Sequence, residues 1–192
     1  MKHDLYFDDF SLGDRFATGG VTVTESAIID FALQWDPQTY HVSREAAAAH
    51  PMGQIFASGF HTVSIMFRLF AQEGIIAKCT FAGGDLQVKW LKPVFAGDTI
   101  RCEFEVIELR AFKSRPGLGA LKMSHTAYNQ KDEVVVDCEC THIITKRPKA
   151  GGIITKRPEA GGIITKRPEA GGIITKRPKT GGSITKRPKT GG

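Results

Sequence analysis

The chain has 192 residues, of which 41% are hydrophobic, and its formal net charge is +6. Positions 143–192 hold 13 Lys and Arg but only 2 Asp and Glu, so this segment carries +11 and the first 142 residues carry −5. The overall positive charge is therefore no evidence that the folded part binds nucleic acid. No apolar run approaches the length of a membrane span, and the acidic N-terminus lacks the apolar segment of a signal peptide, so we expect a cytoplasmic protein without a transmembrane segment.

A ten-residue unit, Ile-Ile-Thr-Lys-Arg-Pro-(Lys/Glu)-(Ala/Thr)-Gly-Gly, occurs five times from Ile143, and its last copy begins with Ser183. Each unit contains proline and a glycine pair but no aromatic residue, so it buries too little apolar surface to offset its chain entropy. We predict one domain at 1–144 and a disordered tail at 145–192. The tail's charge permits binding to nucleic acid or an anionic surface, but it offers no aromatic rings for base stacking. The alternative is a repeat expansion of little consequence to the domain.

The first half of the chain predicts a strand and two helices. A strand is expected at 15–23, interrupted at Gly19-Gly20, which bends or bulges it. The apolar spacing after Thr24 predicts a helix from Glu25 to about Leu33, with Thr22 or Thr24 as its N-cap. A short helix at 43–49 follows, with Ser43 as its N-cap.

The second half predicts one buried helix followed by strands. The helix begins at Gly59, is apolar on most of its surface, and ends near Glu73 with Gly74 as the terminating residue. Strands are expected at 78–81, 85–95, 99–112, 120–130 and 133–144. The alternation of apolar and polar residues at 85–90 is typical of a half-buried strand. This order predicts an α+β domain with an antiparallel sheet.

Asp36 and His41 lie five positions apart in a segment that we expect to be a loop between two helices. Pro37 disfavours the helical conformation at Asp36 and has no N–H group. A carboxylate and an imidazole held in an ordered loop can share a water molecule and act as general base. Taken singly, each residue has an ordinary explanation: a turn carboxylate for Asp36 and a surface histidine for His41.

The predicted helix start at Gly59 is the second feature of the candidate site. A glycine here lets a ligand approach the free N–H groups, where the helix dipole favours developing negative charge, as in an oxyanion hole. Trp35, Phe56 and Phe60 are candidates to line a substrate pocket, or they are core residues. His61 is expected to be a packing or entrance residue rather than a base.

The sequence from Asp36 to His41, the segment Gly53–His61 with Ala57-Ser58-Gly59 at its helix start, and the segment Phe81–Asp98 together resemble the MaoC-like dehydratase family. This family includes the (R)-specific enoyl-CoA hydratases and has the hot-dog fold, an antiparallel sheet wrapped around a central helix. The resemblance covers about residues 5–142. The fullest family pattern is Asp-x-Asn-Pro-x-His-x-Asp, and here Gln38, Thr39 and Ser43 replace its Asn, Pro and final Asp.

The resemblance implies reversible hydration of a 2-enoyl-CoA to a (R)-3-hydroxyacyl-CoA. Asp36 and His41 would be catalytic, and the Gly59 N–H would form the oxyanion hole. Substrate binding would involve a further set of side chains: Trp35, Phe56, Ser58 and Phe60. No metal or redox cofactor is implied. The acyl group of the substrate would be carried as a thioester by coenzyme A or by acyl carrier protein.

The resemblance also implies a homodimer with a continuous sheet, and the acyl-CoA bound near its interface. Two other functions remain open: a hot-dog acyl-CoA thioesterase, in which water attacks the carbonyl carbon, and a non-catalytic acyl-CoA-binding module, which the altered motif suggests.

The four cysteines, and the histidines outside the candidate site, show no metal-ligand spacing. No Cys-x2-Cys pair occurs, so a zinc site is not expected and the cysteines are predicted to be small buried side chains. These are Cys79, Cys102, Cys138 and Cys140. No role is assigned to His3, His50, His125 and His142.

Overall fold

A computed structural model describes residues 3–148. Most of the predicted disordered tail, from 149 onward, lies outside the described residues. The elements, in chain order, are a 3-10 helix η1 (Phe7–Asp9), β1 (Arg15–Ala17), β2 (Val21–Thr22), α1 (Glu25–Trp35), α2 (Thr39–Val42), α3 (Arg44–Ala49), α4 (Gly59–Glu73), β3 (Thr80–Trp90), β4 (Thr99–Ala111), β5 (Leu118–Tyr128) and β6 (Val134–Thr145).

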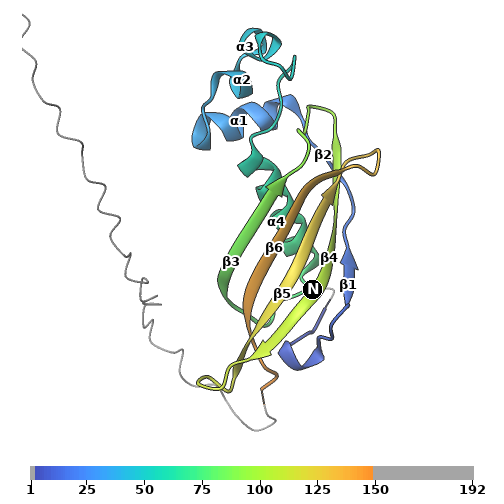
Figure 1. The fold of residues 1–192 in the computed structure, drawn as a ribbon, viewed down its shortest axis with the longest axis vertical. Helices are drawn as coiled ribbons and strands as arrows, with labels where there is room; N and C mark the ends of the chain where they lie inside the picture. The colour runs from blue at the N-terminus through green and yellow to red at the C-terminus, as the bar shows by residue number, and fades with distance from the viewer. Residues whose placement is uncertain (1–2, 149–192) are drawn as a thin grey trace, which may run out of the picture. The chain divides into compact units, whose positions relative to one another are not determined.

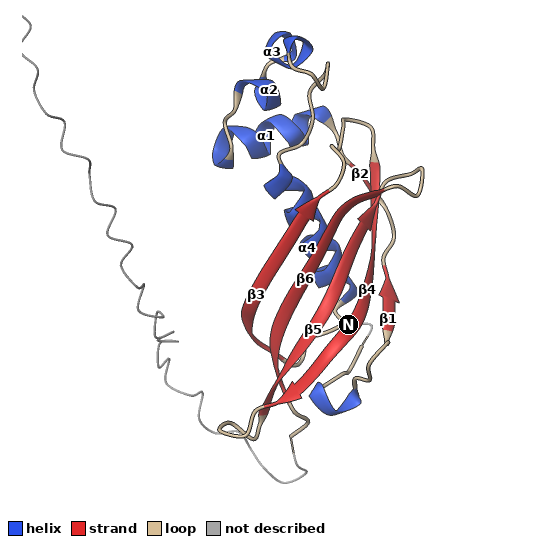
Figure 2. Ribbon diagram, in the orientation of Figure 1, coloured by secondary structure: helices blue, strands red, loops and turns tan. Residues whose placement is uncertain are grey.

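The strands form one antiparallel sheet in the order β1-β4-β5-β6-β3, and β2 pairs separately with β4. The sheet curves around α4, and the short helices α1, α2 and α3 gather at the N-terminal end of α4 (Figures 1 and 2). This arrangement confirms the predicted α+β hot-dog domain.

Helix α4 supplies the centre of the hydrophobic core. Its buried side includes Ile65, Met66, Leu69 and Phe70, which face the inward side chains of the sheet. Ser58 is its N-cap, and Gly74 ends it in the left-handed conformation with φ 71°. Glycine adopts this conformation without steric cost, so the predicted end of the helix is confirmed.

Three features of the strands differ from the sequence-based expectation. The first predicted strand is two short strands, β1 and β2, on either side of the glycine pair at 19–20. The predicted strands 78–81 and 85–95 correspond to one strand, β3, which begins at Thr80 and ends at Trp90, so residues 91–95 lie outside it. The pairing of β3 with β6 has register shifts between Thr80 and Leu86. Most of β3 is exposed rather than half-buried, because it is the edge strand of the described sheet.

The short helices have the predicted caps. Thr24 accepts a hydrogen bond from the amide of Ala27, and Ser43 accepts one from the amide of Ala46. The segment expected to be a loop between them is partly helical, since α2 covers Thr39–Val42. Pro37 lies between α1 and α2, where its missing N–H interrupts no helical hydrogen bond.

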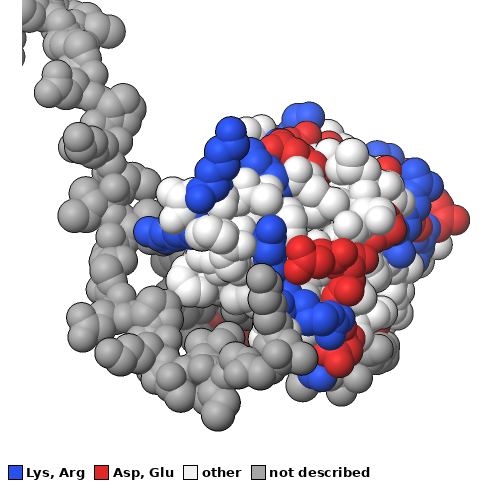
Figure 3. Space-filling model, turned by 90° about the horizontal axis from the view of Figure 1, so that it is seen from below, with Lys and Arg blue, Asp and Glu red and all other residues white. Residues whose placement is uncertain are grey.

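The end of β6 is fastened to the N-terminal segment. The Arg147 guanidinium lies 2.6 Å from the Asp9 carboxylate, donates to the carbonyl of Asp4 and covers the ring of Tyr6. The Arg147 amide donates to the carboxylate of Asp8. The view from below in Figure 3 shows basic and acidic side chains interspersed rather than a patch of one sign.

Candidate active site

The acid and the histidine predicted from the sequence meet at one point. Asp36 is the C-cap of α1, and His41 lies in the next short helix, α2. The turn between the helices places His41 Nε2 3.6 Å from Asp36 Oδ2. This separation exceeds a direct hydrogen bond, and each atom is close enough to the other to bind the same water molecule.

Both carboxylate oxygens of Asp36 are held by neutral donors. The Ser58 hydroxyl donates to Oδ2 at 2.6 Å, and the Gln38 amide donates to Oδ1 at 2.9 Å. The hydroxyl of Tyr40 donates in turn to the Gln38 side-chain oxygen. The Ser58 hydrogen bond, aided by that of Gln38, lowers the pKa of Asp36. Asp36 is therefore a carboxylate at neutral pH.

The tautomer of His41 follows from its second contact. Nδ1 lies 2.7 Å from the carbonyl oxygen of Phe56, and a carbonyl only accepts hydrogen bonds. In the neutral ring the proton is therefore on Nδ1, and the lone pair of Nε2 faces Asp36. The ring is 3% exposed and packs edge-on against Tyr40 and Phe56, so its orientation is fixed. A fixed imidazole with a free lone pair is suited to accept a proton from water.

Gly59 is the first residue of α4, as predicted, and its N–H has no acceptor among the described residues. The Trp90 indole packs directly on this backbone: a Cβ at position 59 would lie 2.6 Å from Trp90 Nε1. The glycine thus permits a close approach that any other residue would obstruct. Its free amide lies at the positive end of a 15-residue helix, a suitable position for an oxyanion.

A cleft of about 330 Å³ lies beside Gly59. Its lining includes Phe56, Thr62, Trp90, Leu91 and Val94, so its walls are mainly apolar. Asp36 and His41 do not line it directly, and Phe56, which accepts the hydrogen bond from His41, connects them to its wall.

The four predicted substrate-binding residues occupy different environments. Phe56 lines the cleft. Phe60 is 64% exposed and lies edge-on to Trp90 at the surface. Trp35 is 73% exposed at the end of α1, so neither Trp35 nor Phe60 is a core residue. Ser58 is fully buried, and its hydroxyl faces Asp36 rather than the cleft.

His61 is a packing residue, as expected. Its ring stacks on Phe31 at 4.6 Å between centroids and is 8% exposed. Its Nδ1 is buried without a hydrogen-bond partner among the described residues. Burial lowers the pKa of this ring, which favours its neutral form in the core.

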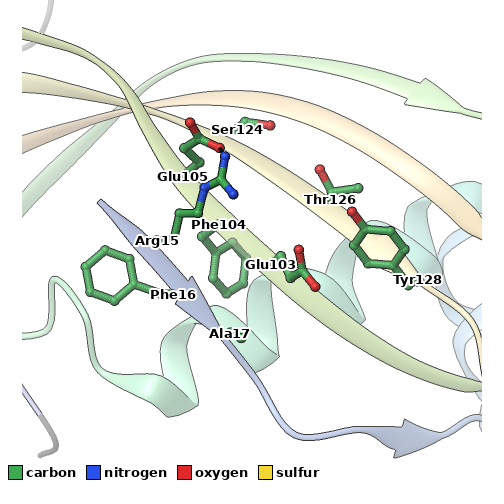
Figure 4. Close-up of a pocket in the computed structure, with 9 residues that line it drawn as sticks. All are labelled: Arg15, Phe16, Ala17, Glu103, Phe104, Glu105, Ser124, Thr126 and Tyr128. Carbon is green, nitrogen blue, oxygen red and sulfur yellow. Dashed lines mark ion pairs between the residues drawn. The ribbon is translucent and has the colours of Figure 1, made fainter. Parts of the chain in front are cut away.

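A larger hollow of about 410 Å³ lies elsewhere, on the face of the sheet opposite α4 (Figure 4). It is formed by β1, β4 and β5, and its side chains include Ser124, Thr126, Tyr128 and the ion pair of Arg15 with Glu105. It contains none of the predicted site residues and no acid–histidine pair, so it is not the candidate active site.

Sequence reasoning missed Gln38, Tyr40 and Trp90. Gln38 stood out only as a departure from the family pattern, yet it holds one oxygen of the acid. Trp90 was placed on a strand far along the chain, and nothing local shows that it meets Gly59. The alternation of side chains along β3 and its pairing with β6, in which Trp90 lies opposite Val136, bring the indole to Gly59.

Comparison with known proteins agrees with this fold. A family model described as MaoC like domain matches residues 10–129. The uncharacterized protein YdeM of Bacillus subtilis is 32% identical over 143 residues, which are 74% of this chain and 100% of YdeM. A MaoC-like dehydratase from Rhodospirillum rubrum is 32% identical, with a TM-score of 0.71 over 76% of this chain and 99% of that structure.

The R-hydratase PhaJ1 from Pseudomonas aeruginosa has a TM-score of 0.59 at 16% identity, covering 79% of this chain and 95% of that one, which shows a shared fold. Within residues 3–148 no helix is both long and apolar enough to cross a membrane. The family match spans more than half of the chain, and the chain therefore belongs to the MaoC-like domain family.

Proposed function

We propose that the protein catalyses the reversible hydration of a 2-enoyl-CoA to a (R)-3-hydroxyacyl-CoA. The observation that carries the proposal is the arrangement at the end of α1. An ionised Asp36 lies 3.6 Å from Nε2 of His41, and Ser58 connects Asp36 to the helix whose first amide, that of Gly59, is free. A base, a water-binding carboxylate and an oxyanion donor are the groups that hydration of a conjugated thioester requires.

The reaction proceeds through the thioester enolate. A water molecule donates one hydrogen bond to Asp36 and one to His41 Nε2, and its lone pair faces the β-carbon of the substrate. His41 takes a proton as the C–O bond forms, and the Gly59 N–H stabilises the negative charge that develops on the carbonyl oxygen. The proton on His41 then passes to the α-carbon. Dehydration follows the same steps in reverse.

The cleft beside Gly59 supports an acyl substrate. Phe56, Trp90 and Leu91 give it apolar walls, and Lys92 is the charged residue in its lining. An acyl chain against these walls would leave its carbonyl at the Gly59 amide and its β-carbon toward Asp36 and His41. Coenzyme A is the proposed carrier and no other cofactor is proposed. A cytoplasmic location, expected from the sequence, remains part of the proposal.

We also propose a homodimer that pairs through β3. This strand is the edge of the sheet, and several of its large apolar side chains and those just after it are exposed: Phe81, Leu86, Trp90 and Leu91. An unpaired strand with apolar side chains is suited to pair with another strand. Trp90 belongs both to this edge and to the cleft, which would place the acyl-CoA near the dimer interface.

The dimer is tested by analytical ultracentrifugation of the wild type, Leu86→Lys and a matched control, Leu12→Lys, which alters an exposed leucine away from β3. We expect dimers for the wild type and the control, and monomers for Leu86→Lys. A wild-type monomer with full activity at assay concentration would refute the dimer.

The hydratase activity is tested by the loss of enone absorbance when the protein is mixed with crotonyl-CoA and with longer and branched enoyl-CoAs. Asp36→Asn and His41→Ala should each reduce kcat by about 100-fold or more, the scale of a general acid–base contribution. Asp30→Asn is a matched control, since Asp30 lies on the same helix outside the site.

Two outcomes would replace the proposal. Release of free thiol without formation of a hydroxyacyl product would indicate a thioesterase. Tight binding of enoyl-CoA without turnover would indicate an acyl-CoA-binding module, and would implicate the substitutions at Gln38, Thr39 and Ser43 relative to the family pattern.

A further inference from the structure

Two histidines that had no role in the sequence analysis meet in the core. His125 on β5 and His142 on β6 point to the inner face of the sheet, and their Nε2 atoms lie 3.3 Å apart. Both side chains are buried, and His142 stacks on Phe70 of α4. Cys140 lies on the same face of β6, two residues from His142. The candidate ligand atoms of the three residues lie within 4.8 Å of one another.

The spacing of the two imidazoles fits one shared ion. Two nitrogen ligands at tetrahedral angles around one ion are about 3.3 Å apart. The sulfur of Cys140 would complete a three-ligand site by moving inward by roughly 1 Å, since a nitrogen and a sulfur on one ion are about 3.6 Å apart. The three ligands come from two adjacent, fully paired strands, so the backbone would not have to rearrange.

The side chains next to the three candidate ligands carry sulfur, which is a soft metal ligand. Met123 is the cross-strand partner of Cys140, and Cys138 is the cross-strand partner of His125. All are buried on the inner face, and side chains paired in this way lie about 5 Å apart. No carboxylate is among the ligand groups. Soft thiolate and thioether ligands select Cu(I), Zn or iron–sulfur clusters in proteins, and imidazole suits copper and zinc, so this ligand set fits Cu(I).

The charge of the site favours the same ion. Its position beneath Phe67, Phe70 and Phe104 is apolar, so an uncompensated charge would be costly. One thiolate neutralises a monovalent ion completely but leaves a divalent ion with a net positive charge. Both rings are buried, and burial disfavours the charged imidazolium, so they favour the neutral form that can bind an ion.

We propose that His125, His142 and Cys140 form a buried Cu(I) site between β5, β6 and α4, separate from the acid–histidine site at the N-terminal end of α4. Binding displaces the Cys140 proton into solvent, so the neutral trio and Cu(I) become a neutral complex and one released proton. The bound ion would join two strands to each other beneath the central helix and would therefore stabilise the folded state.

A simpler account is a hydrogen bond between two neutral imidazoles, one ring donating from Nε2 to the other. It explains the 3.3 Å distance but assigns nothing to Cys140. The two accounts differ in their dependence on the thiol, and this difference is the basis of the test.

The full-length protein is titrated anaerobically with Cu(I) held by the chelator bicinchoninate, and the copper transferred to the protein is measured. We expect one Cu(I) per chain for the wild type. Cys140→Ser and His142→Gln should weaken retention by at least tenfold. Cys102→Ser, which alters a buried thiol on β4 outside the cluster, should retain copper like the wild type. Residues 149–192 contain no Cys, His or Met to compete.

X-ray absorption at the copper edge of the wild type gives a measurement that does not depend on the folding of a variant. Two nitrogen neighbours and at least one sulfur neighbour support the site. Absence of sulfur, absence of stoichiometric retention by the wild type, or equal retention by Cys140→Ser would each overturn it. Cys140-dependent binding of Zn(II) without binding of Cu(I) would overturn the choice of a monovalent ion.

Discussion

Ser58 joins Asp36 to the central helix. Its hydroxyl donates to Asp36 Oδ2 at 2.6 Å and also accepts a hydrogen bond from the amide of Phe60 in the first turn of α4. One small side chain thus fixes the acid at the end of α1 relative to the helix start that presents the Gly59 amide. The two halves of the proposed catalytic site are therefore a single hydrogen-bonded unit.

Replacement of Ser58 by Ala should impair both halves of this unit. The carboxylate loses its strongest donor, so the pKa of Asp36 rises toward its ordinary value. A hydrogen bond to a charged group contributes about 1.5–3 kcal/mol, so we expect kcat to fall by roughly 10- to 100-fold. As the pH is lowered, the variant should lose activity at a higher pH than the wild type does, because Asp36 is protonated earlier.

Carbon-13 NMR titration of the aspartate carboxylates checks the shift in pKa directly. Ser58→Thr retains a hydroxyl and should restore part of the activity. Ser64→Ala is the matched control, because the Ser64 hydroxyl bonds only the carbonyl of Phe60 within its own helix. An unchanged pKa of Asp36 in Ser58→Ala would contradict the role assigned to Ser58.

A side chain at position 59 should displace Trp90. The Cβ of Gly59→Ala would meet the indole at 2.6 Å, and the indole, which is half exposed, can move outward. The displaced ring would change the cleft wall beside the oxyanion donor, and we expect a loss of activity of about 10- to 100-fold, the scale of a displacement near 1 Å.

A double-mutant cycle with Trp90→Ala separates this effect from a change in the helix. If displacement of the indole is the cause, adding Gly59→Ala to Trp90→Ala should have little further effect. Gly117→Ala serves as control, since its Cβ would meet open space. Additive losses in the double variant would contradict the proposed contact.

His61 should make the domain less stable as the pH falls. Burial lowers the pKa of its folded ring, whereas the unfolded ring titrates near 6.5. Below that pH the unfolded chain binds a proton that the folded chain does not, so this contribution to stability is complete above about pH 6.5 and decreases as the pH falls toward the folded pKa.

The variant His61→Phe retains the stacking on Phe31 and removes both the titration and the unpaired Nδ1. Urea unfolding at pH 7.5 and pH 5.5 should show a smaller loss of unfolding free energy for the variant than for the wild type. Equal losses would indicate that His61 is protonated in the folded state.

The boundary between the domain and the repeats should lie after Arg147 rather than before it. Deletion of residues 149–192 should leave unfolding free energy and hydratase activity unchanged. Deletion of residues 146–192 also removes the contacts of Arg147 with Asp9 and Tyr6, and should lower the unfolding free energy slightly, since these contacts are partly exposed.

Chemical denaturation of both truncated chains and of Arg147→Ala measures these differences. The single variant should account for most of the loss seen on deletion from 146. A loss of folding on deletion of 149–192 would instead show that the domain extends into the repeats.

The sequence alone was enough to predict the central helix, most of the strands and the two principal residues of the candidate site. Thr24, Ser43 and Gly74 mark helix ends by local hydrogen bonding and backbone geometry, which depend on a few neighbouring residues. Asp36 and His41 are close in sequence, and a single turn at Pro37 brings them together. Such local relationships are encoded by spacing, and spacing is visible without a structure.

Tertiary structure decided what joins segments that are far apart in the chain. The contact of Trp90 with Gly59 and the meeting of His125 with His142 both depend on the register of β6 against its neighbours. A shift of one residue would turn each of these strand side chains to the opposite face. Periodicity places Cys140 and His142 on one face of a strand, but only the pairing of β5 with β6 brings a second imidazole to them.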